Sequence, residues 1–324
     1  MPREKTKCIT SIGGQALVEG IMMRGPHKTE IAVRNTDGGI SLEEMKTSDG
    51  IAKKHKAFRL PLLRGIAAFI DSITIGYRAL SVSVEKAGLD SDGDCEESKF
   101  DKWVEKKFGE KTMAAVMTAG TVLGVLFAIV LFFILPTWAF NLIEVPAGQG
   151  LEGWRSPIEG AMRMAIFLAY IILCSRMKDV RRVFEYHGAE HKTIFCYEND
   201  EELTVDNVRR HRRFHPRCGT SFIVLMLILG IIIGLFIPFR NPFLRTAVKI
   251  LCIPAVMAIG YELIRYCGRN ENMLTRIISA PGLWVQRITT KEPDDSMIEV
   301  AIAAIKEVIP ENGEDRIDLR GVAK

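Results

Sequence analysis

The sequence lacks the motifs by which several large classes of enzymes and binding proteins are identified. It contains no glycine-rich phosphate loop, no serine–histidine–aspartate order and no dinucleotide-binding fingerprint. It has no basic patch with interleaved aromatic residues, and its formal net charge is only +4 over 324 residues. Lysine and arginine gather beside apolar runs instead, which is typical of membrane topology signals. The sequence therefore predicts no nucleic-acid partner.

Features of secreted proteins are also missing. The seven cysteines are an odd number, and Cys174, Cys252 and Cys267 lie in or next to apolar segments, which argues against a disulfide framework. The first eight residues are followed by no apolar stretch of the kind that forms a signal peptide. We therefore expect most of the cysteines to be inert, buried thiols.

Long apolar runs are what the chain does contain. The uncharged run from Thr112 to Ile143 has 32 residues, and the run from Cys218 to Phe239 has 22. Each exceeds the roughly 20 residues that cross a bilayer as a helix. Two weaker apolar segments accompany them. The sequence therefore predicts an integral membrane protein with about four transmembrane helices, near residues 114–135, 158–175, 218–239 and 247–264.

The distribution of basic residues orients these helices. Segment 136–157 contains one basic residue, Arg155, whereas the loop 176–217 contains ten lysines and arginines. By the positive-inside rule the loop is cytoplasmic and the segment 136–157 is external. We therefore expect a multi-pass protein of the cytoplasmic (inner) membrane with both termini in the cytoplasm.

The segment 61–84 is apolar except for Arg64, Asp71 and Arg78, which are spaced seven residues apart and so share one helical stripe. It is long enough to span a membrane, but a span would export residues 1–60 with their eleven lysines and arginines. The sequence favours an amphipathic helix at the interface or packed in a bundle. A true span is the alternative.

The remaining segments complete a mainly α-helical membrane protein with a small N-terminal antiparallel β-sheet. Within residues 1–60, apolar and polar residues alternate over 13–46, which predicts a cytoplasmic β-meander. The amphipathic pattern of Ile298, Ile302 and Ile305 predicts a helix near the C-terminus. The expected organisation is a β-meander (1–60), an amphipathic helix (61–84), a charged linker and helix (85–113), a four-helix membrane region containing the histidine-rich loop (114–264), and a cytoplasmic C-terminal region (265–324).

Four of the six histidines lie in the loop 176–217. His187, Glu190 and His191 form a His-x-x-Glu-His pattern, which on a helix brings two imidazoles and a carboxylate together on one face. In inverted zincins the two histidines of this pattern bind zinc, and the glutamate is the general base for an attacking water. The alternative without a metal site is that these histidines face solvent on a charged helix. We expect His211, among arginines, to be exposed.

A second group, His215-Pro216-Arg217-Cys218, offers a further imidazole and a thiol to the same ion. His187, His191, His215 and Cys218 together would make a structural site, whereas three of them with water would make a catalytic one. Glu262 is an alternative third ligand, because it follows His191 by 71 residues as a downstream glutamate does in inverted zincins. Alternatively, Glu262 forms an ion pair with an arginine such as Arg265 and binds no metal.

Several motifs together resemble the YqhQ family of bacterial membrane proteins. They are G-G-Q-A-L-V-E-G-I-M-M-R-G-P, L-P-L-L-R-G, Y-H-G-A-E-H-K-T-I, R-F-H-P-R-C-G-T-S-F, Y-E-L-I-R and P-G-L-W-V-Q-R-I-T-T-K-E-P-D-D. The resemblance covers nearly the whole chain, and it implies a membrane protein of a family described as predicted metal-dependent enzymes. The polar residues that it implies are Glu19, Arg24, His187, Glu190, His191, His215, Arg217, Cys218 and Glu262.

The sequence thus favours a metal-dependent hydrolase at the cytoplasmic membrane surface, with a divalent metal, zinc foremost, as cofactor. Glu190 would activate a metal-bound water, and Arg24 or Arg217 would stabilise developing negative charge. The expected partners are the lipid bilayer and an unidentified membrane-proximal substrate or protein. The alternative is a non-enzymatic scaffold or assembly factor with a structural metal clamp.

A transporter is disfavoured, because the spans show almost no ionisable residues at midplane depth and no pair of broken helices. Glu159 and Arg163, near the outer end of one span, are spaced to pair with each other.

Overall fold

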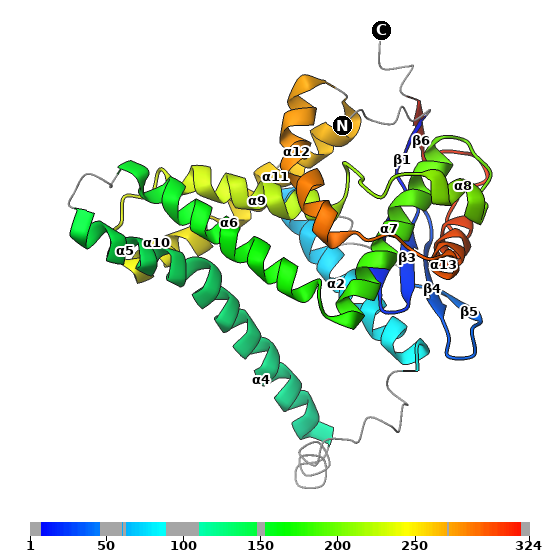
Figure 1. Ribbon diagram of the computed structural model, residues 1–324, viewed down its shortest axis with the longest axis horizontal. Coiled ribbons are helices and arrows are strands. Elements are labelled where there is room, and N and C mark those ends of the chain that lie inside the picture. Colours follow the sequence, from blue (N-terminus) through cyan, green and yellow to red (C-terminus); the bar gives the residue numbers. More distant parts are fainter. Residues whose placement is uncertain are drawn as a thin grey trace. The chain divides into compact units, whose positions relative to one another are not determined.

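The computed structural model describes residues 8–45, 60, 63–88, 110–147, 153–270 and 272–318. The chain divides into two units. The first comprises Met1–Asp90, Ile171–Leu225 and Met257–Lys324, and the second comprises Ser91–Tyr170 and Met226–Val256. Helices predominate, and the small sheet is antiparallel (Figure 1), so the predicted fold class is confirmed.

The sheet of the first unit is the predicted meander. Its strands follow the order β2-β3-β4-β5, with every neighbouring pair antiparallel. Gly38 has φ +85 in the turn between the last two strands, a conformation that favours glycine. The strands are β2 (Gly13–Leu17), β3 (Gly20–Arg24), β4 (Thr29–Arg34) and β5 (Ile40–Glu44). The sequence did not predict a second pairing, in which β1 (Cys8–Thr10) meets β6 (Arg316–Asp318) near the other end of the chain.

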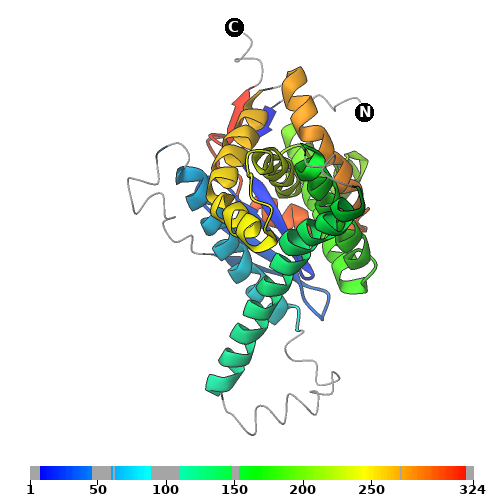
Figure 2. The same ribbon diagram turned by 90° about the vertical axis from the view of Figure 1, so that its left-hand side faces the viewer.

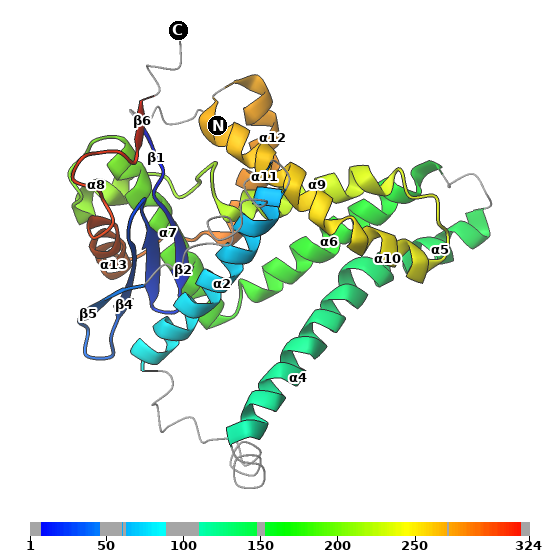
Figure 3. The same cartoon turned by 180° about the vertical axis from the view of Figure 1, so that it is seen from behind.

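Helices cover both faces of the meander. Ile21 and Met23 point to one face, where they join a core with α7 (Lys178–Glu198) and α13 (Asp295–Lys306). Met22 and Ile31 point to the other face, where they pack against α2 (Leu63–Lys86). Figures 1 and 3 show α2 and α13 on opposite sides of the strands. Because successive side chains of a strand point to opposite faces, the apolar residues of the central strands cover both faces of the sheet.

Helix α2 has features of both alternatives that the sequence left open, a membrane span and a packed amphipathic helix. Its length and composition suffice for a membrane span, yet Ile75 and Ala79 pack against the sheet. Gly65 lies so close to Ala258 and Tyr261 of α11 (Ile253–Arg269) that a Cβ would be 2.8 Å from Tyr261. Large apolar side chains on the remaining surface are exposed, namely Leu63, Ile70, Ile73, Tyr77 and Leu80. Its amphipathic assignment therefore stays a prediction.

The other candidate spans lie wholly or partly in the second unit. Two are single stretches, Val122–Glu144 and Arg155–Cys174. The first runs through α4 (Glu110–Ile129, the long teal helix of Figure 2), the π-helix η2 (Val130–Ile134) and α5 (Leu135–Ala147). The second is α6 (Arg155–Cys174). By length and composition, three helices of the described chain can cross a membrane, or four with the bent pair below.

Two predicted spans differ from expectation. Helix α9 (Gly219–Gly234) has 16 residues, so at ~1.5 Å per residue it covers about 24 Å, less than the roughly 30 Å of a hydrocarbon core. It ends before the predicted Phe239. The last span is bent by 45° between α10 (Pro242–Leu251) and α11. The break at Cys252 comes just before Pro254, whose ring cannot continue an uninterrupted helix.

A cluster of ionisable residues is buried inside the second unit, around the Glu159 that the sequence places near the outer end of one span. The carboxylate of Glu159 accepts from Arg155 at 3.1 Å, Arg245 at 3.0 Å and Lys249 at 2.5 Å. Arg163 does not take up the predicted pairing and instead donates to the carbonyl of Phe132, 2.7 Å away in the π-helix. The sequence did not reveal this cluster because its members come from two helices, α6 and α10, that are far apart in the chain.

Candidate metal site

Helix α7 carries the predicted histidine motif. It begins after Met177, has Asp179 in its first turn, where an acidic residue favours the helix dipole, and ends at Glu198. Residues 188–198 are all buried, because one side of the helix packs on the sheet and another on α13. His187 is half-buried and His191 is buried, so the pair does not lie on an open helix surface. His191 is 1% exposed and Glu190 is 5% exposed.

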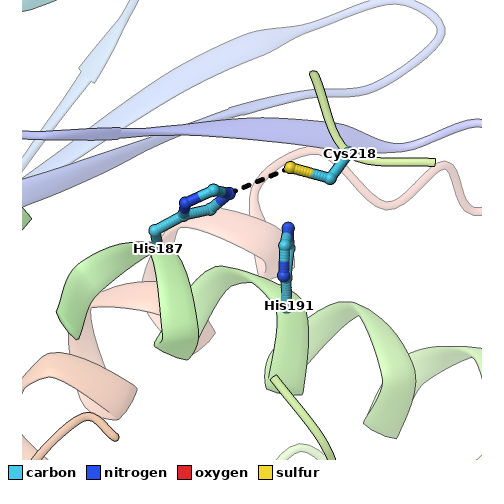
Figure 4. A group of neighbouring side chains, drawn as sticks. All are labelled: His187, His191 and Cys218. Carbon is cyan, nitrogen blue, oxygen red and sulfur yellow. Dashed lines mark hydrogen bonds between the residues drawn. The ribbon is translucent and has the colours of Figure 1, made fainter. Parts of the chain in front are cut away.

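Three predicted ligands converge in the structure. The ligand atoms of His187, His191 and Cys218 all lie within 4.8 Å of one another. The Nε2 of His187 is 3.2 Å from the Sγ of Cys218, and the two imidazole rings have centroids 4.4 Å apart. Figure 4 shows both rings on one side of α7 and the thiol approaching from the loop before α9. The donor set is two nitrogens and one sulfur, which suits zinc.

Two backbone carbonyls determine which histidine nitrogens are available. The Nδ1 of His187 is 2.9 Å from the carbonyl oxygen of Thr289, and the Nδ1 of His191 is 2.6 Å from that of Arg213. Because a carbonyl oxygen only accepts, each Nδ1 must carry the hydrogen. The lone pairs are therefore on the Nε2 atoms, and metal-binding histidines commonly show this second contact.

Close packing against α7 holds the first of these carbonyls in place. Helix α12 (Met273–Thr289) ends beside α7, and the N–H of Lys291 donates to the carbonyl of Phe184 at 2.8 Å. A Cβ on Gly188 would lie 2.0 Å from the carbonyl oxygen of Lys291. Glycine is therefore required between the two halves of the histidine motif.

Strand β2 positions Glu190. A Cβ on Gly14 would lie 2.9 Å from the Cγ and Cδ of Glu190, and the backbone of Gly14 acts to lower the pKa of this carboxyl. Burial raises the pKa of Glu190 to about 7, against an ordinary 4.5. A carboxyl group with this pKa exchanges a proton readily near neutral pH, which is the property of a general base.

The pKa shifts of His191 and Cys218 are in the directions that favour binding of a cation. Burial, with the neighbouring His187, lowers the pKa of His191 to about 4, so its imidazole is neutral at physiological pH. For Cys218, burial acts to raise the pKa, but His191 and Thr220 outweigh it and lower the pKa below its ordinary 9.0. Neutral imidazole and thiolate are the forms that bind metals.

His215 and Arg217 lie beside the three ligands, in contact with a residue that sequence reasoning missed. The ring of His215 is 5.5 Å from that of His191, and its Nε2 is 3.7 Å from Glu198. Arg217 also contacts the Glu198 carboxylate, which is 1% exposed. Burial acts to raise the pKa of Glu198, but His215 and Arg217 outweigh it and lower the pKa. Glu198 follows His191 by seven residues, a helical spacing that could have revealed it.

Two predicted residues lie elsewhere. The carboxylate of Glu262 is held by the guanidinium of Arg64, which supports the arginine-pairing alternative with a different arginine from the one expected. Arg24, at the end of β3, is exposed and lines a neighbouring cavity of about 330 Å³. The structure therefore brings neither residue to the histidine pair.

A cavity of about 410 Å³ adjoins the candidate ligands. Its walls are β2, α7 and the loop 215–220, and both Glu190 and Arg217 line it. It shares Gly13, Gly14, Gln15 and Ser72 with the neighbouring cavity. A substrate could therefore reach the histidine pair from the open side of β2.

A second group of metal-binding types, Cys196, Glu201 and His211, is less suited to an ion. Burial raises the pKa of the Cys196 thiol to about 11, so it stays protonated. His211 is buried, contrary to expectation, with its Nε2 3.2 Å from Glu201.

Comparisons with known proteins identify relatives. Residues 60–311 match the family model described as "Protein of unknown function (DUF1385)". The chain is 35% identical over 306 residues to the "Uncharacterized protein YqhQ" of Bacillus subtilis (strain 168), covering 94% of each chain. No solved structure matches the chain.

Proposed function

The chain belongs to the DUF1385 family and is a relative of YqhQ. We propose that it is a metal-dependent membrane hydrolase that holds one divalent ion between His187, His191 and Cys218. Zinc is the ion that this donor set favours. The observation that carries the proposal is the pair of Nδ1 contacts to backbone carbonyls, which leaves both Nε2 lone pairs beside the thiol.

His187, His191 and Cys218 would hold the ion, which when bound would supply Lewis-acid polarisation of a substrate or of a water. Glu190, which lines the same cavity as the candidate ligands, takes a proton from the attacking water and passes it to the leaving group. Arg217 lines the cavity and opposes negative charge that develops there. Arg24 contacts substrate from the neighbouring cavity instead of the reacting centre.

We place this site at the cytoplasmic face of the inner membrane, with both termini on that side. Ten lysines and arginines in the loop 176–217, around the candidate ligands, support this orientation. The partners are then the lipid bilayer and a membrane-proximal substrate.

A structural clamp is the second candidate, favoured by the 5.5 Å between the rings of His191 and His215. A small rotation of His215 would add a fourth protein ligand and join the loop to α7 without leaving an open position. The clamp predicts that His215→Ala loses the metal. The hydrolase predicts that this variant retains it.

Metal content tests the proposal. Full-length chain purified in detergent without chelator should contain about one zinc or similar ion per chain, as three well-placed ligands would bind. The double variant His187→Ala, His191→Ala should lose the ion, whereas His27→Ala, which removes an exposed histidine beside Glu314, should keep it. Folded wild-type protein without metal would refute the proposal.

A further inference from the structure

We propose that the substrate is a polypeptide, bound in an extended conformation as an additional strand along the free edge of β2. This inference rests on the proposed hydrolase function, because it identifies the substrate of that site. It is carried by the edge of the sheet, the hydrogen-bonding directions of β2 and the cavity beside it.

Strand β2 is an edge strand whose outward groups can be assigned. The N–H of Gly25 donates to Lys28 and the N–H of Arg34 donates to Glu19, both at 2.8 Å. Since antiparallel ladders alternate, the odd-numbered residues of β3 bond to β4 and its even-numbered residues bond to β2. By the same register, the N–H and C=O groups of Gly14 and Ala16 point away from β3.

Glu190 lies beside this part of β2. A Cβ built on Gly14 would be 2.9 Å from the Cγ and Cδ of Glu190, so the candidate catalytic residue adjoins the strand next to its outward-pointing groups. Over residues 8–45 and the other described ranges, no strand pairs with this edge. Edges of this kind bind extended peptides in several recognition domains, because main-chain hydrogen bonds supply affinity for any sequence.

The cavity follows the strand. Five consecutive residues, 12–16, line the 410 Å³ cavity, and three of them also line the 330 Å³ cavity. A Cβ on Gly13 would meet nothing within 4 Å. The space therefore runs along the backbone of β2, which suits an extended chain with side chains on alternate sides better than a compact small molecule.

The register also places the bond to be cleaved. A substrate strand that pairs antiparallel with β2 would accept a hydrogen bond from the N–H of Ala16 and donate one to its C=O. Opposite Gly14 the substrate backbone would lie beside Glu190, whose side chain adjoins Gly14, and in the cavity that the candidate metal ligands line. The water oxygen bonds to the carbonyl carbon of the peptide bond there, and the C–N bond breaks. The proton taken by Glu190 goes to the leaving nitrogen, giving a carboxylate and an amine from one peptide bond and one water.

Two proline variants test the pairing on full-length, zinc-loaded protein in detergent, in a Glu190→Gln background that prevents turnover. Ala16→Pro removes an outward N–H of β2 without removing a bond to β3. Leu42→Pro is the matched control on β5, the opposite edge of the sheet. The N–H of Met45 donates to Thr29, and by the alternation of the ladder the N–H of Leu42 therefore points outward from β5. The probe is a library of random-sequence dodecapeptides, quantified by mass spectrometry after capture.

Ala16→Pro should reduce captured peptide about tenfold, the effect of one lost backbone hydrogen bond and the steric block of the ring. Leu42→Pro should capture as much as its parent, and both should keep their zinc. Gly13→Val, which fills the open space, should also lose capture and replaces Ala16→Pro if that variant does not fold. With Glu190 restored, zinc-dependent fragments should appear.

The outcomes separate the two proposals. A chain that binds zinc but captures no peptide, or that captures equally with either proline, overturns the polypeptide substrate and leaves the proposed metal site standing. A chain that binds no zinc overturns the proposed function, and peptide capture that is lost only in Ala16→Pro would then still establish strand pairing.

Discussion

At the scale of single residues, burial sets the chemistry of the site. Glu190 and His191 are adjacent in sequence and both buried, yet burial shifts their pKa values in opposite directions, because it disfavours the charged form of each. Both groups are therefore less charged than they would be in water. A bound cation would favour the carboxylate of Glu190 and leave His191 as the neutral ligand it already is.

Cys218 is the ligand that most distinguishes this site from a pair of surface histidines. Its Sγ is the only sulfur among the three grouped ligands. Cys218→Ser should lower zinc affinity by about a hundredfold or more, since even contacts to metal ligands from outside the coordination shell contribute ten- to hundredfold. Competition with a fluorescent chelator measures this. The control Cys252→Ser lies outside the site, and equal affinity in both variants would contradict the assignment.

Glu190 gives the metal-free protein a pH-dependent stability with a definite sign. Its folded pKa, about 7, is above the ordinary 4.5, so the folded state holds the proton more tightly. Its contribution is present below pH 4.5 and is lost as pH rises through 7, amounting to about 3 kcal/mol at ~1.4 kcal/mol per pKa unit. Glu190→Gln should therefore unfold at a higher temperature than wild type at pH 8, and the difference should shrink toward pH 5. Thermal unfolding of chelator-treated protein measures both, and a pH-independent difference would contradict the raised pKa.

The candidate ligands were predictable where local spacing determines position. His187, Glu190 and His191 lie within five residues of one helix, and Cys218 lies beside a proline turn that returns the chain to them. Glu262 was not predictable, because its partner Arg64 is 198 residues away in sequence. Pairings over such separations depend on tertiary packing that no local pattern contains.

At the scale of elements, the site depends on the contact of α7 with the segment after α12. Gly188→Ala would place a Cβ 2.0 Å from the Lys291 carbonyl oxygen and push that segment away. The Thr289 carbonyl would then leave the Nδ1 of His187. Overpacking of this kind typically costs about 1–3 kcal/mol.

The variant should accordingly lower both the unfolding temperature and zinc affinity. Gly124→Ala is the matched control, because a Cβ there meets nothing within 4 Å in α4. Unchanged zinc affinity in Gly188→Ala would show that the Thr289 carbonyl does not orient His187.

The predicted elements succeeded where the pattern was continuous. Alternation over 13–46 predicted the meander, and the long apolar run predicted the helix through Val122–Glu144. The early end of α9 and the bend at Cys252 were missed, because the apolar composition continues across both. The β1–β6 pairing was missed because its strands lie near opposite ends of the chain.

At the scale of the whole molecule, the two units should respond separately to mutation. Glu159→Gln would leave Arg155, Arg245 and Lys249 buried without their shared carboxylate. Removing one member of a buried ion cluster typically costs about 3–5 kcal/mol. Thermal unfolding in detergent should show this loss, whereas Glu144→Gln, whose carboxylate is 3.8 Å from Arg155, should have a smaller effect. Zinc content should be unchanged in Glu159→Gln protein that remains folded, since the candidate ligands all belong to the first unit.

The zinc coordination shell tests the central claim most directly. X-ray absorption at the zinc edge of the purified, detergent-solubilised full-length chain should show one sulfur at about 2.3 Å and two nitrogens and one light atom at about 2.0–2.1 Å. The sulfur should disappear in Cys218→Ser, and the His215→Ala spectrum should match that of wild type. A shell without sulfur, or one that loses a nitrogen in His215→Ala, would contradict a three-ligand site with an open position.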